Sequence, residues 1–318
     1  MRDIIFLRLK DITRFLRANL SFFFNKKENF YSSLDLQILE EINKYHSKLL
    51  LTKKYKLNTH NAFSKKVLKL IINKNLLNFL QLGYIQQMFF IHNRFFIIYE
   101  LIKLVNHKKW KLWKKLIKEN DIGNPVRFFL YPYTSGNKIH QVNHLKEFNS
   151  FSKIDLSEHI NVVEFGGGYG NMASIFSKIN RRINYIIFDT QEVGMLQYYY
   201  LKKCKLDVGF GIKNKNKIKL IYNIKDLRKA VKKFKNNQNN LFISNWSISE
   251  VPLKLRDKFN FIFKKFNYQI FSFQSKFEKI NNLKYFNNLY SIYKLKKRRS
   301  IMYEMSGKKE NFYLFSSK

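Results

Sequence analysis

Apolar residues follow two different spacings along the chain. Through roughly the first 120 residues they recur every three to four positions, which is the spacing of amphipathic helices. From Asp155 onward, short apolar runs alternate with helical segments, a pattern typical of parallel strands joined by crossover helices. We therefore expect a helical N-terminal region followed by an α/β region.

The N-terminal helices are predicted from the apolar side of each segment. At 35–51, for example, Leu36, Ile42 and Leu49 fall largely on one side. The Gly-Asn-Pro sequence at 123–125 ends the helical region, because glycine and proline interrupt helices. The predicted helices cover 1–24, 35–51, 66–82, 83–106 and 107–120, with a further one at 140–148 after an irregular aromatic stretch at 128–136.

The α/β region is predicted from apolar runs at 161–165, 183–188, 218–222, 241–244 and 268–273. Two later runs, Ser300–Met305 and Phe312–Ser316, flank Ser306-Gly307-Lys308 and predict a closing hairpin. The predicted fold class is α/β, with a Rossmann-like, mostly parallel sheet, an antiparallel C-terminal hairpin and a preceding α-helical domain. The predicted domains are a helical one at 1–122, a connecting segment that would cover a substrate at 123–154, and the α/β domain at 155–318.

The charge of the chain suggests an anionic partner without identifying it. Lys and Arg number 60 against 22 Asp and Glu, so the formal net charge is +38, which favours a polyanion or an anionic membrane surface. Lysine far outnumbers arginine, although arginine is the residue that binds phosphate bidentately. An AT-biased genome produces the same lysine-rich composition, so the charge does not by itself indicate that the protein binds anions. Hydrophobic residues make up 45% of the chain, so a mostly disordered protein is excluded.

The counts of cysteine and histidine exclude several kinds of site. Cys204 is the single cysteine, which excludes an internal disulfide and a multi-cysteine zinc site. His140 and His144 are four residues apart but have no evident third ligand, so no metal is expected. Charged residues interrupt the apolar positions of 1–24, which favours an amphipathic helix over a signal peptide. With no run of 18 apolar residues, a cytoplasmic protein is expected.

The segment with the clearest chemistry is Asn161–Ser174, NVVEFGGGYGNMAS. A buried strand would lead into a glycine-rich turn and then a helix, whose first amides can face a ligand. Two classes of cofactor use such a turn. Gly168-x-Gly170-x-x-Ala173 fits dinucleotides, whereas acid-x-Gly-x-Gly-x-Gly fits S-adenosyl-L-methionine (AdoMet). The second pattern comprises Glu164, Gly166, Gly168 and Gly170, with Gly167 inside the same turn.

Two acids near the turn favour a nucleoside cofactor. The Glu164 carboxylate can pair with the cationic methionine end of AdoMet, but it would repel a pyrophosphate. Asp189 ends the next strand, where Rossmann-like folds place a carboxylate that accepts from ribose hydroxyls. Asp189 fits NAD and AdoMet equally, and helix capping is an alternative role for it. A turn that serves only strand–helix packing is the alternative for the glycines.

Three segments together resemble a bacterial family of sugar O-methyltransferases, which are class I AdoMet-dependent methyltransferases. They are EFGGGYGNMA at 164–173, YIIFDTQEVGMLQYYYL at 185–201 and LFISNWSISEVP at 241–252. Thr190-Gln191 departs from the Leu-Pro that this family often has after the acid. The resemblance implies that 155–318 binds AdoMet. It also implies that the acceptor is a hydroxyl of a sugar, nucleotide-sugar or lipid-linked saccharide in surface polysaccharide or glycolipid biosynthesis.

Catalytic residues are expected where the fourth strand ends, because ligands of parallel α/β sheets bind at the carboxyl ends of the strands. Asn245 is expected to contact the cofactor there. A neutral hydroxyl needs a base that accepts its proton. Glu250 is the first candidate, and His140 and His144, in the segment that would cover the site, are the others.

Alternatives involving nucleic acid stay open: an RNA methyltransferase, or a non-catalytic nucleic-acid-binding protein with a methyltransferase fold. Ser244-Asn245-Trp246-Ser247 lacks the prolines of the Asn-Pro-Pro-Tyr turn of amino-methyltransferases, which argues against amine methylation. The basic helix at 108–118 has an apolar stripe that includes Trp110 and Trp113. This helix is either a solvated face, a contact with the anionic inner membrane surface or, less favoured, a contact with nucleic acid.

Overall fold

The computed structural model describes residues 30–51, 62–89, 96–180, 182–213, 215–235, 238–292, 299–306 and 308–317. The helix predicted at 1–24 lies outside these ranges. The chain divides into two compact units, each described by itself: unit 1 is Met1–Lys146 with Met195–Lys205, and unit 2 is Glu147–Gly194 with Leu206–Lys318. The domain boundaries predicted after residues 122 and 154 stay predictions.

Unit 1 is mostly helical, as the apolar spacing predicted. Its aromatic stretch, predicted to be irregular, contains a short antiparallel ribbon of β1 and β2. Helices α7 and α9 each have residues in both units. The elements are α2 (Ser33–Leu51), α3 (Ala62–Ile72), η1 (Phe79–Gln81), α4 (Gly83–Met88), α5 (Phe96–Val105), α6 (Trp110–Ile117), β1 (Arg127–Phe128), β2 (Tyr131–Ser135), α7 (Gly136–Ser152) and α9 (Gln191–Lys203).

Helix α3 ends ten residues before the helix predicted at 66–82 would end. Lys74 has a φ of 52°, in the left-handed region. The amide of Asn75 donates to the carbonyl of Leu70 at 2.9 Å, and that of Lys74 donates to Ile71 at 3.1 Å. These two bonds around a left-handed residue form a Schellman motif, which ends a helix. Glycine usually occupies the left-handed position, so a lysine there gave no sign of the stop.

The second part of α9 is joined to α2 inside unit 1 by a buried carboxylate. Asp35 is 1% exposed; it accepts from the Tyr199 hydroxyl at 2.8 Å and from Lys203 Nζ at 2.9 Å. Burial raises the pKa of Asp35, but the hydrogen bonds from Lys203, Ser32 and Tyr199 outweigh it and hold the pKa below its usual value. Unit 1 thus combines segments that are about 160 residues apart in sequence.

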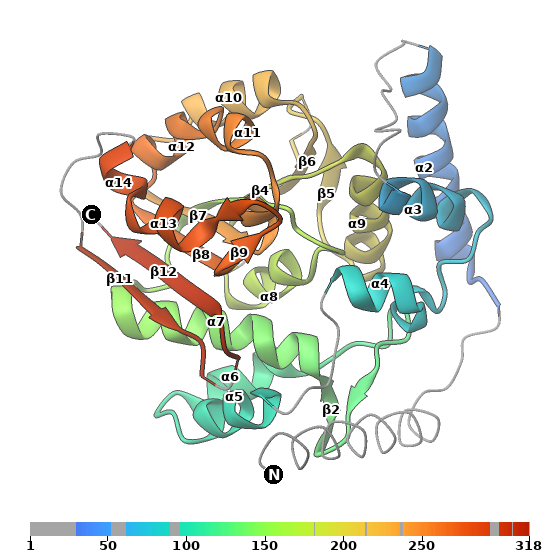
Figure 1. The fold of residues 1–318 in the computed structure, drawn as a ribbon. Coiled ribbons are helices and arrows are strands. Elements are labelled where there is room, and N and C mark those ends of the chain that lie inside the picture. Colours follow the sequence, from blue (N-terminus) through green and yellow to red (C-terminus); the bar gives the residue numbers. More distant parts are fainter. Residues whose placement is uncertain are drawn as a thin grey trace. The chain divides into compact units, whose positions relative to one another are not determined.

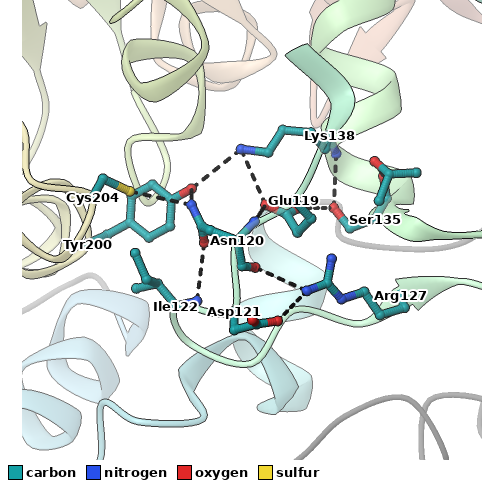
Figure 2. A network of polar contacts seen from close by, with 10 residues as sticks. Glu119, Asn120, Asp121, Ile122, Arg127, Ser135, Lys138, Tyr200 and Cys204 are labelled. Atoms are coloured by element: carbon teal, nitrogen blue, oxygen red, sulfur yellow. Dashed lines mark hydrogen bonds and ion pairs between the residues drawn. The ribbon is translucent and has the colours of Figure 1, made fainter. Parts of the chain in front are cut away.

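Figure 2 shows a further buried polar network of unit 1. Lys138 Nζ lies 3.3 Å from the Glu119 carboxylate and 3.5 Å from the Tyr200 hydroxyl, and the side chains of Lys138 and Glu119 are almost fully buried. Asn120 Nδ2 donates to the Tyr200 hydroxyl at 3.2 Å and to Cys204 Sγ at 3.4 Å. A buried ion pair whose charges are also hydrogen-bonded tolerates the low dielectric around it. The network therefore holds the segment that follows α6 against α9.

Unit 2 is built around one eight-stranded sheet in the order β11-β12-β8-β7-β3-β4-β6-β5. The six strands from β8 to β5 in this order run parallel to one another, and β12 runs antiparallel to both β8 and β11, which confirms the predicted hairpin. The three-residue edge strand β5 was not predicted. The strands are β3 (Ile160–Phe165), β4 (Asn184–Phe188), β5 (Val208–Phe210), β6 (Ile218–Ile221), β7 (Asn239–Asn245), β8 (Tyr268–Gln274), β11 (Arg299–Glu304) and β12 (Asn311–Ser317).

Helices cover both faces of this sheet (Figure 1). On one face, Phe242 and Phe271 pack in a large core against α10, α12 and α13. On the other face, Phe176 of α8 lies 5.8 Å from Tyr185 of β4, measured between ring centroids. The remaining elements of unit 2 are α8 (Asn171–Ile179), α10 (Ile224–Lys232), η2 (Ser247–Glu250), α11 (Leu253–Asp257), α12 (Asn260–Lys265), β9 (Lys276–Phe277), β10 (Ile280–Asn281), α13 (Asn282–Asn287) and α14 (Leu289–Ile292).

Helix α6, for which a membrane contact was one of three predicted roles, buries most of its apolar stripe, and Trp110 is half-buried. Trp113, Leu116 and Ile117 are fully buried in unit 1, and Trp113 Nε1 donates to His107 Nδ1 at 3.0 Å. A membrane contact of α6 would therefore have to use its lysines. Across the described ranges, no helix combines the length and the apolar character needed to cross a bilayer. The exposed lysines of this segment are Lys108, Lys109, Lys111, Lys114, Lys115 and Lys118.

Candidate cofactor site

The predicted glycine-rich turn lies at the carboxyl end of β3. Gly166, Gly168 and Gly170 have φ angles of 73°, 56° and 97°, which glycine adopts without the steric cost that a Cβ brings. The amide of Gly170 donates to the carbonyl of Gly167 at 2.9 Å, which closes the turn. Gly170 is the N-cap of α8 and offers no side-chain cap, so the first amides of the helix face the turn.

The turn is held against the end of the neighbouring strand β7. Ser247 Oγ donates to the carbonyl of Gly166 at 3.1 Å, and it lies 3.2 Å from the carbonyl oxygen of Asn245. A Cβ at position 166 would overlap Ser247 Oγ and Cβ. Position 166 therefore requires glycine for two reasons: its backbone conformation and the close approach of Ser247.

Glu164 is inside unit 2 and not on its surface. Its side chain is on β3, the residue is 4% exposed, and its Oε2 accepts from the Tyr185 hydroxyl at 2.8 Å. Burial raises the pKa of Glu164 to about 8, the charge of Asp189 adds to this, and the bond from Tyr185 opposes it. The protonated form of this carboxyl is therefore favoured at neutral pH. The predicted pairing with a cationic methionine end stays a prediction, and the role of Tyr185 was not predicted.

Asp189 follows β4 at the same edge of the sheet. Its Oδ1 accepts from the amide of Thr190 at 2.8 Å. Thr190, and not Asp189, occupies the capping position of α9, because the carbonyl of Thr190 accepts the first helical bond from Gly194 at 2.9 Å. A hydrogen bond also joins the end of β4 to the turn, since the amide of Gly166 donates to the carbonyl of Phe188 at 2.9 Å. Asp189 thus lies beside the turn, as a ribose-binding carboxylate would.

The end of β7 completes this edge. Asn245 is 8% exposed, and its Oδ1 accepts from Ser272 Oγ at 3.0 Å. Trp246 has a φ of 69°, which is uncommon for a bulky residue, and Lys308 Nζ lies 3.7 Å from the centroid of its ring. The structure therefore brings the turn, Glu164, Asp189 and Asn245 together at the carboxyl ends of three adjacent strands. Lys308 was not predicted, because nothing in the spacing relates the C-terminal hairpin to this edge.

Glu250 lies in η2, directly after this edge, and is half-buried. Burial raises the pKa of Glu250, while a hydrogen bond from Gln274 and the charge of Lys308 lower it. Gln274 Nε2 donates to Glu250 Oε1 at 3.3 Å. A carboxylate that is more basic than usual is suited to accept a proton, which is the role predicted for Glu250.

His140 and His144, the other predicted bases, belong to unit 1. Both are buried on α7, and their Nε2 atoms are 3.1 Å apart, so one ring donates to the other. His140 Nδ1 lies 2.8 Å and 2.9 Å from the two Glu100 carboxylate oxygens. Across the described ranges, no group of three or more His, Cys, Asp or Glu residues is arranged to hold a metal ion. The role of either histidine as base stays a prediction.

Comparisons with known proteins show similarity only at the level of the fold. No family model matches the sequence, and no curated protein matches it. Similar solved structures include an rRNA methylase from Streptococcus thermophilus, at 12% identity and a TM-score of 0.40 over 56% of this chain and 96% of that one. A SAM-dependent methyltransferase from Aquifex aeolicus matches at 14% identity and a TM-score of 0.37, over 54% of this chain and 88% of that one. The fibrillarin pre-rRNA processing protein of Methanococcus jannaschii matches at 7% identity and a TM-score of 0.38, over 52% of this chain and 68% of that one.

These TM-scores are below 0.5, so the similar structures do not identify a function for this chain. The sheet itself settles the fold class. Six neighbouring strands, from β5 to β8, run parallel; the antiparallel β12 follows them and separates them from the edge strand β11, and helices cover both faces. In the order and direction of its strands, unit 2 has the Rossmann-like sheet of class I methyltransferases.

Proposed function

We propose that the chain is an AdoMet-dependent methyltransferase that acts on a sugar hydroxyl. The observation that carries the proposal is the turn between β3 and α8, where three glycines adopt positive φ beside Asp189. A pyrophosphate at this turn would oppose ionisation of Glu164 and be repelled by its carboxylate, whereas the cationic methionine end of AdoMet would favour that ionisation. The residues present therefore fit AdoMet better than NAD.

Each residue at the edge has a distinct task in this proposal. When bound, AdoMet supplies an electrophilic methyl group on a sulfonium. The glycine turn would admit the methionine end, since its glycines carry no side chain that would keep a ligand from the backbone. Asp189 would accept from the ribose hydroxyls, and Asn245 would orient the cofactor. A cation bound near Glu164 would lower its pKa and favour the carboxylate form.

The proposed acceptor is a hydroxyl of a sugar, nucleotide-sugar or lipid-linked saccharide. Its support is the resemblance of 164–173, 185–201 and 241–252 to sugar O-methyltransferases, and the Ser-Asn-Trp-Ser sequence at 244–247. Glu250 would accept the hydroxyl proton while the oxygen bonds to the methyl group; the bond between that methyl group and sulfur would break, which leaves S-adenosylhomocysteine. Alignment of the two reactants would supply much of the acceleration.

Binding of S-adenosylhomocysteine, measured by calorimetry, tests the cofactor site. We expect the full chain to bind it, and Gly168→Ala to weaken binding at least tenfold, because the new Cβ strains the turn. Gly211→Ala is the matched control: Gly211 also has a positive φ, 75°, and a Cβ there meets no atom within 4 Å. Absence of binding to the wild type, or equal binding to Gly168→Ala, would contradict the proposal.

Turnover of three variants tests the base. With labelled AdoMet and a panel of nucleotide-sugars and lipid-linked saccharides, we expect Glu250→Gln to lower kcat about 100-fold or more while S-adenosylhomocysteine binding is retained. Loss of activity in His140→Ala or His144→Ala, with Glu250→Gln unaffected, would move the role to the histidines. Normal turnover in all three would show that none is the base.

Methylation of RNA is the second candidate, because the +38 charge favours a polyanion. Transfer of label to an RNA transcript, with none to any saccharide of the panel, would establish it in place of the sugar. Failure to bind S-adenosylhomocysteine, together with RNA affinity at physiological salt, would instead indicate a non-catalytic nucleic-acid-binding protein.

A further inference from the structure

Unit 1 contains a cleft of about 710 Å³, which the methyltransferase proposal does not use. It lies between the end of α3, the turn that follows α3, and the start of α4. Sites for small molecules typically have volumes of about 300–1,000 Å³. The cleft is thus large enough for a ligand of nucleotide size and too large for a single phosphate ion.

The cleft is basic on its α3 side. Lys66 and Lys69 are three residues apart on α3, so their side chains leave the same face of the helix. Lys74 adds a third positive charge from the turn, and all three lysines are exposed. The described residues that line the cleft include no carboxylate, and none of the ion pairs among the described residues involves these lysines. Three positive charges therefore face the cleft without a compensating acid among the described lining residues.

The turn that presents Lys74 is held in place before any ligand binds. Tyr31 donates through its hydroxyl to the carbonyl of Lys74, and the same oxygen accepts from the amide of Leu76 at 2.8 Å. The Schellman motif at the end of α3 fixes the other side of the turn. A site that is already ordered loses less conformational entropy on binding.

The rest of the lining suits an organic group attached to the anion. Tyr84 is half-buried and its ring lies 5.5 Å from Lys66 Nζ. Burial raises the pKa of the Tyr84 phenol, so it stays neutral and does not repel an anion. Leu70 and Leu77 supply apolar surface, and Asn73 and Asn75 supply exposed side-chain amides.

We propose that this cleft binds the diphosphate group of a nucleoside diphosphate or of a sugar attached to one. A nucleoside diphosphate carries about three negative charges at neutral pH, and its sugar-linked form about two, which the three lysines can neutralise. Its nucleoside or sugar would occupy the part of the cleft that a lone phosphate would leave empty. Binding here does not depend on methyl transfer, because every residue named belongs to unit 1 and none is in the glycine turn.

Calorimetry of the full chain with uridine diphosphate and adenosine diphosphate tests the proposal, with uridine and inorganic phosphate as comparisons. At about 150 mM salt we expect at least one diphosphate to bind with a Kd in the micromolar range. Uridine and phosphate should each bind at least tenfold more weakly. Absence of diphosphate binding, or equal affinity for inorganic phosphate, would overturn the proposal.

Three variants locate the site. Lys66→Ala and Lys69→Ala are each expected to weaken binding about tenfold, as expected for loss of a charge-assisted hydrogen bond. Lys74→Gly should also weaken binding, yet raise the midpoint of thermal unfolding, because glycine adopts the left-handed backbone at lower cost. Lost binding could then not be ascribed to unfolding. Lys111→Ala, an exposed lysine of α6, is the control and should leave affinity unchanged.

Two further outcomes separate this site from other anionic partners. If the same variants lose affinity for a short RNA or for anionic vesicles while no diphosphate binds, the ligand is a macromolecule and the proposal is wrong. If Lys111→Ala weakens diphosphate binding as much as Lys66→Ala does, the charge and not the cleft is responsible, and the proposal is wrong. S-adenosylhomocysteine binding should be the same in all four variants, so failure of this proposal is distinct from failure of the cofactor site.

Discussion

At the scale of single residues, Glu164 makes stability depend on pH. Its pKa is about 8 in the folded chain, above the ordinary value of 4.5, because the carboxyl is buried. Between these values the folded state holds a proton that the unfolded state has released. Stability is therefore lost as pH rises through this window, by about 1.4 kcal/mol per pH unit for this one group.

Replacement of Glu164 by Gln should remove that loss. The amide oxygen can still accept from Tyr185, so we expect wild type and Glu164→Gln to have similar stability near pH 4. The variant should be more stable by on the order of several kcal/mol near pH 8, measured by urea denaturation. Glu158→Gln, at an exposed position, is the control. A constant difference at all pH values would show that Glu164 is not buried in this way.

The sequence allowed the glycines and Asp189 to be predicted because each is defined locally, by a turn and by the end of a strand. Tyr185 could not be predicted as the partner of Glu164, since a tyrosine in a strand is common for packing reasons alone. Lys308 is more than 60 residues from Trp246 in sequence, and only the antiparallel insertion of β12 brings it to the ring. Residues joined by long-range contacts therefore leave no local pattern.

At the scale of elements, the packing of the β3 turn against η2 can be tested by paired substitutions. Gly166→Ala should destabilise unit 2 by about 2 kcal/mol or more, through its positive φ and its overlap with Ser247. Ser247→Gly removes the overlapping atoms, so the double variant should be more stable than the sum of the two single effects. Simple additivity in chemical denaturation would show that the two turns do not touch.

The β11–β12 hairpin should influence the pH dependence of catalysis through Lys308. The charge of Lys308 lowers the pKa of Glu250, so Lys308→Ala should raise that pKa. A base works only when deprotonated, so the acid limb of kcat/KM should move to higher pH, while Lys308→Arg keeps it in place. An unmoved limb, with turnover intact, would mean that Glu250 is not the group that titrates.

Elements were predictable where burial imposes a simple pattern. β3 and β8 are buried strands rich in apolar residues, and the predicted runs at 161–165 and 268–273 match each of them to within one residue. The prediction at 241–244 covers only the middle of β7, because asparagines occupy both ends of that strand. β5 has three residues at the sheet edge, too few to establish a period. The end of α3 was wrongly predicted because its stop signal is a backbone conformation of lysine, which the apolar spacing does not record.

At the scale of the whole molecule, the +38 charge predicts salt-sensitive binding of nucleic acid without selectivity. Lysine-mediated contacts with phosphates release counterions, so affinity for a short single-stranded RNA should fall about 1,000-fold or more between about 50 and 200 mM salt. S-adenosylhomocysteine affinity should change little over this range, because the candidate cofactor site would bind it mainly through backbone groups and hydrogen bonds. Such binding does not release counterions from the ligand. Fluorescence anisotropy measures the first and calorimetry the second. RNA affinity that persists at the higher salt would favour the RNA methyltransferase.

Synthesis of this chain from its N-terminus imposes a delay on unit 1. Asp35 of α2 needs Tyr199 and Lys203 to satisfy its buried carboxylate, and those residues follow two strands of unit 2 in sequence. Domains made of one continuous segment can fold as soon as they leave the ribosome. Here the first helices emerge long before their partners do. Residues 1–146 therefore lack part of unit 1 when they are expressed alone or fused to another protein. Unit 1 is complete only once residue 205 has been synthesised.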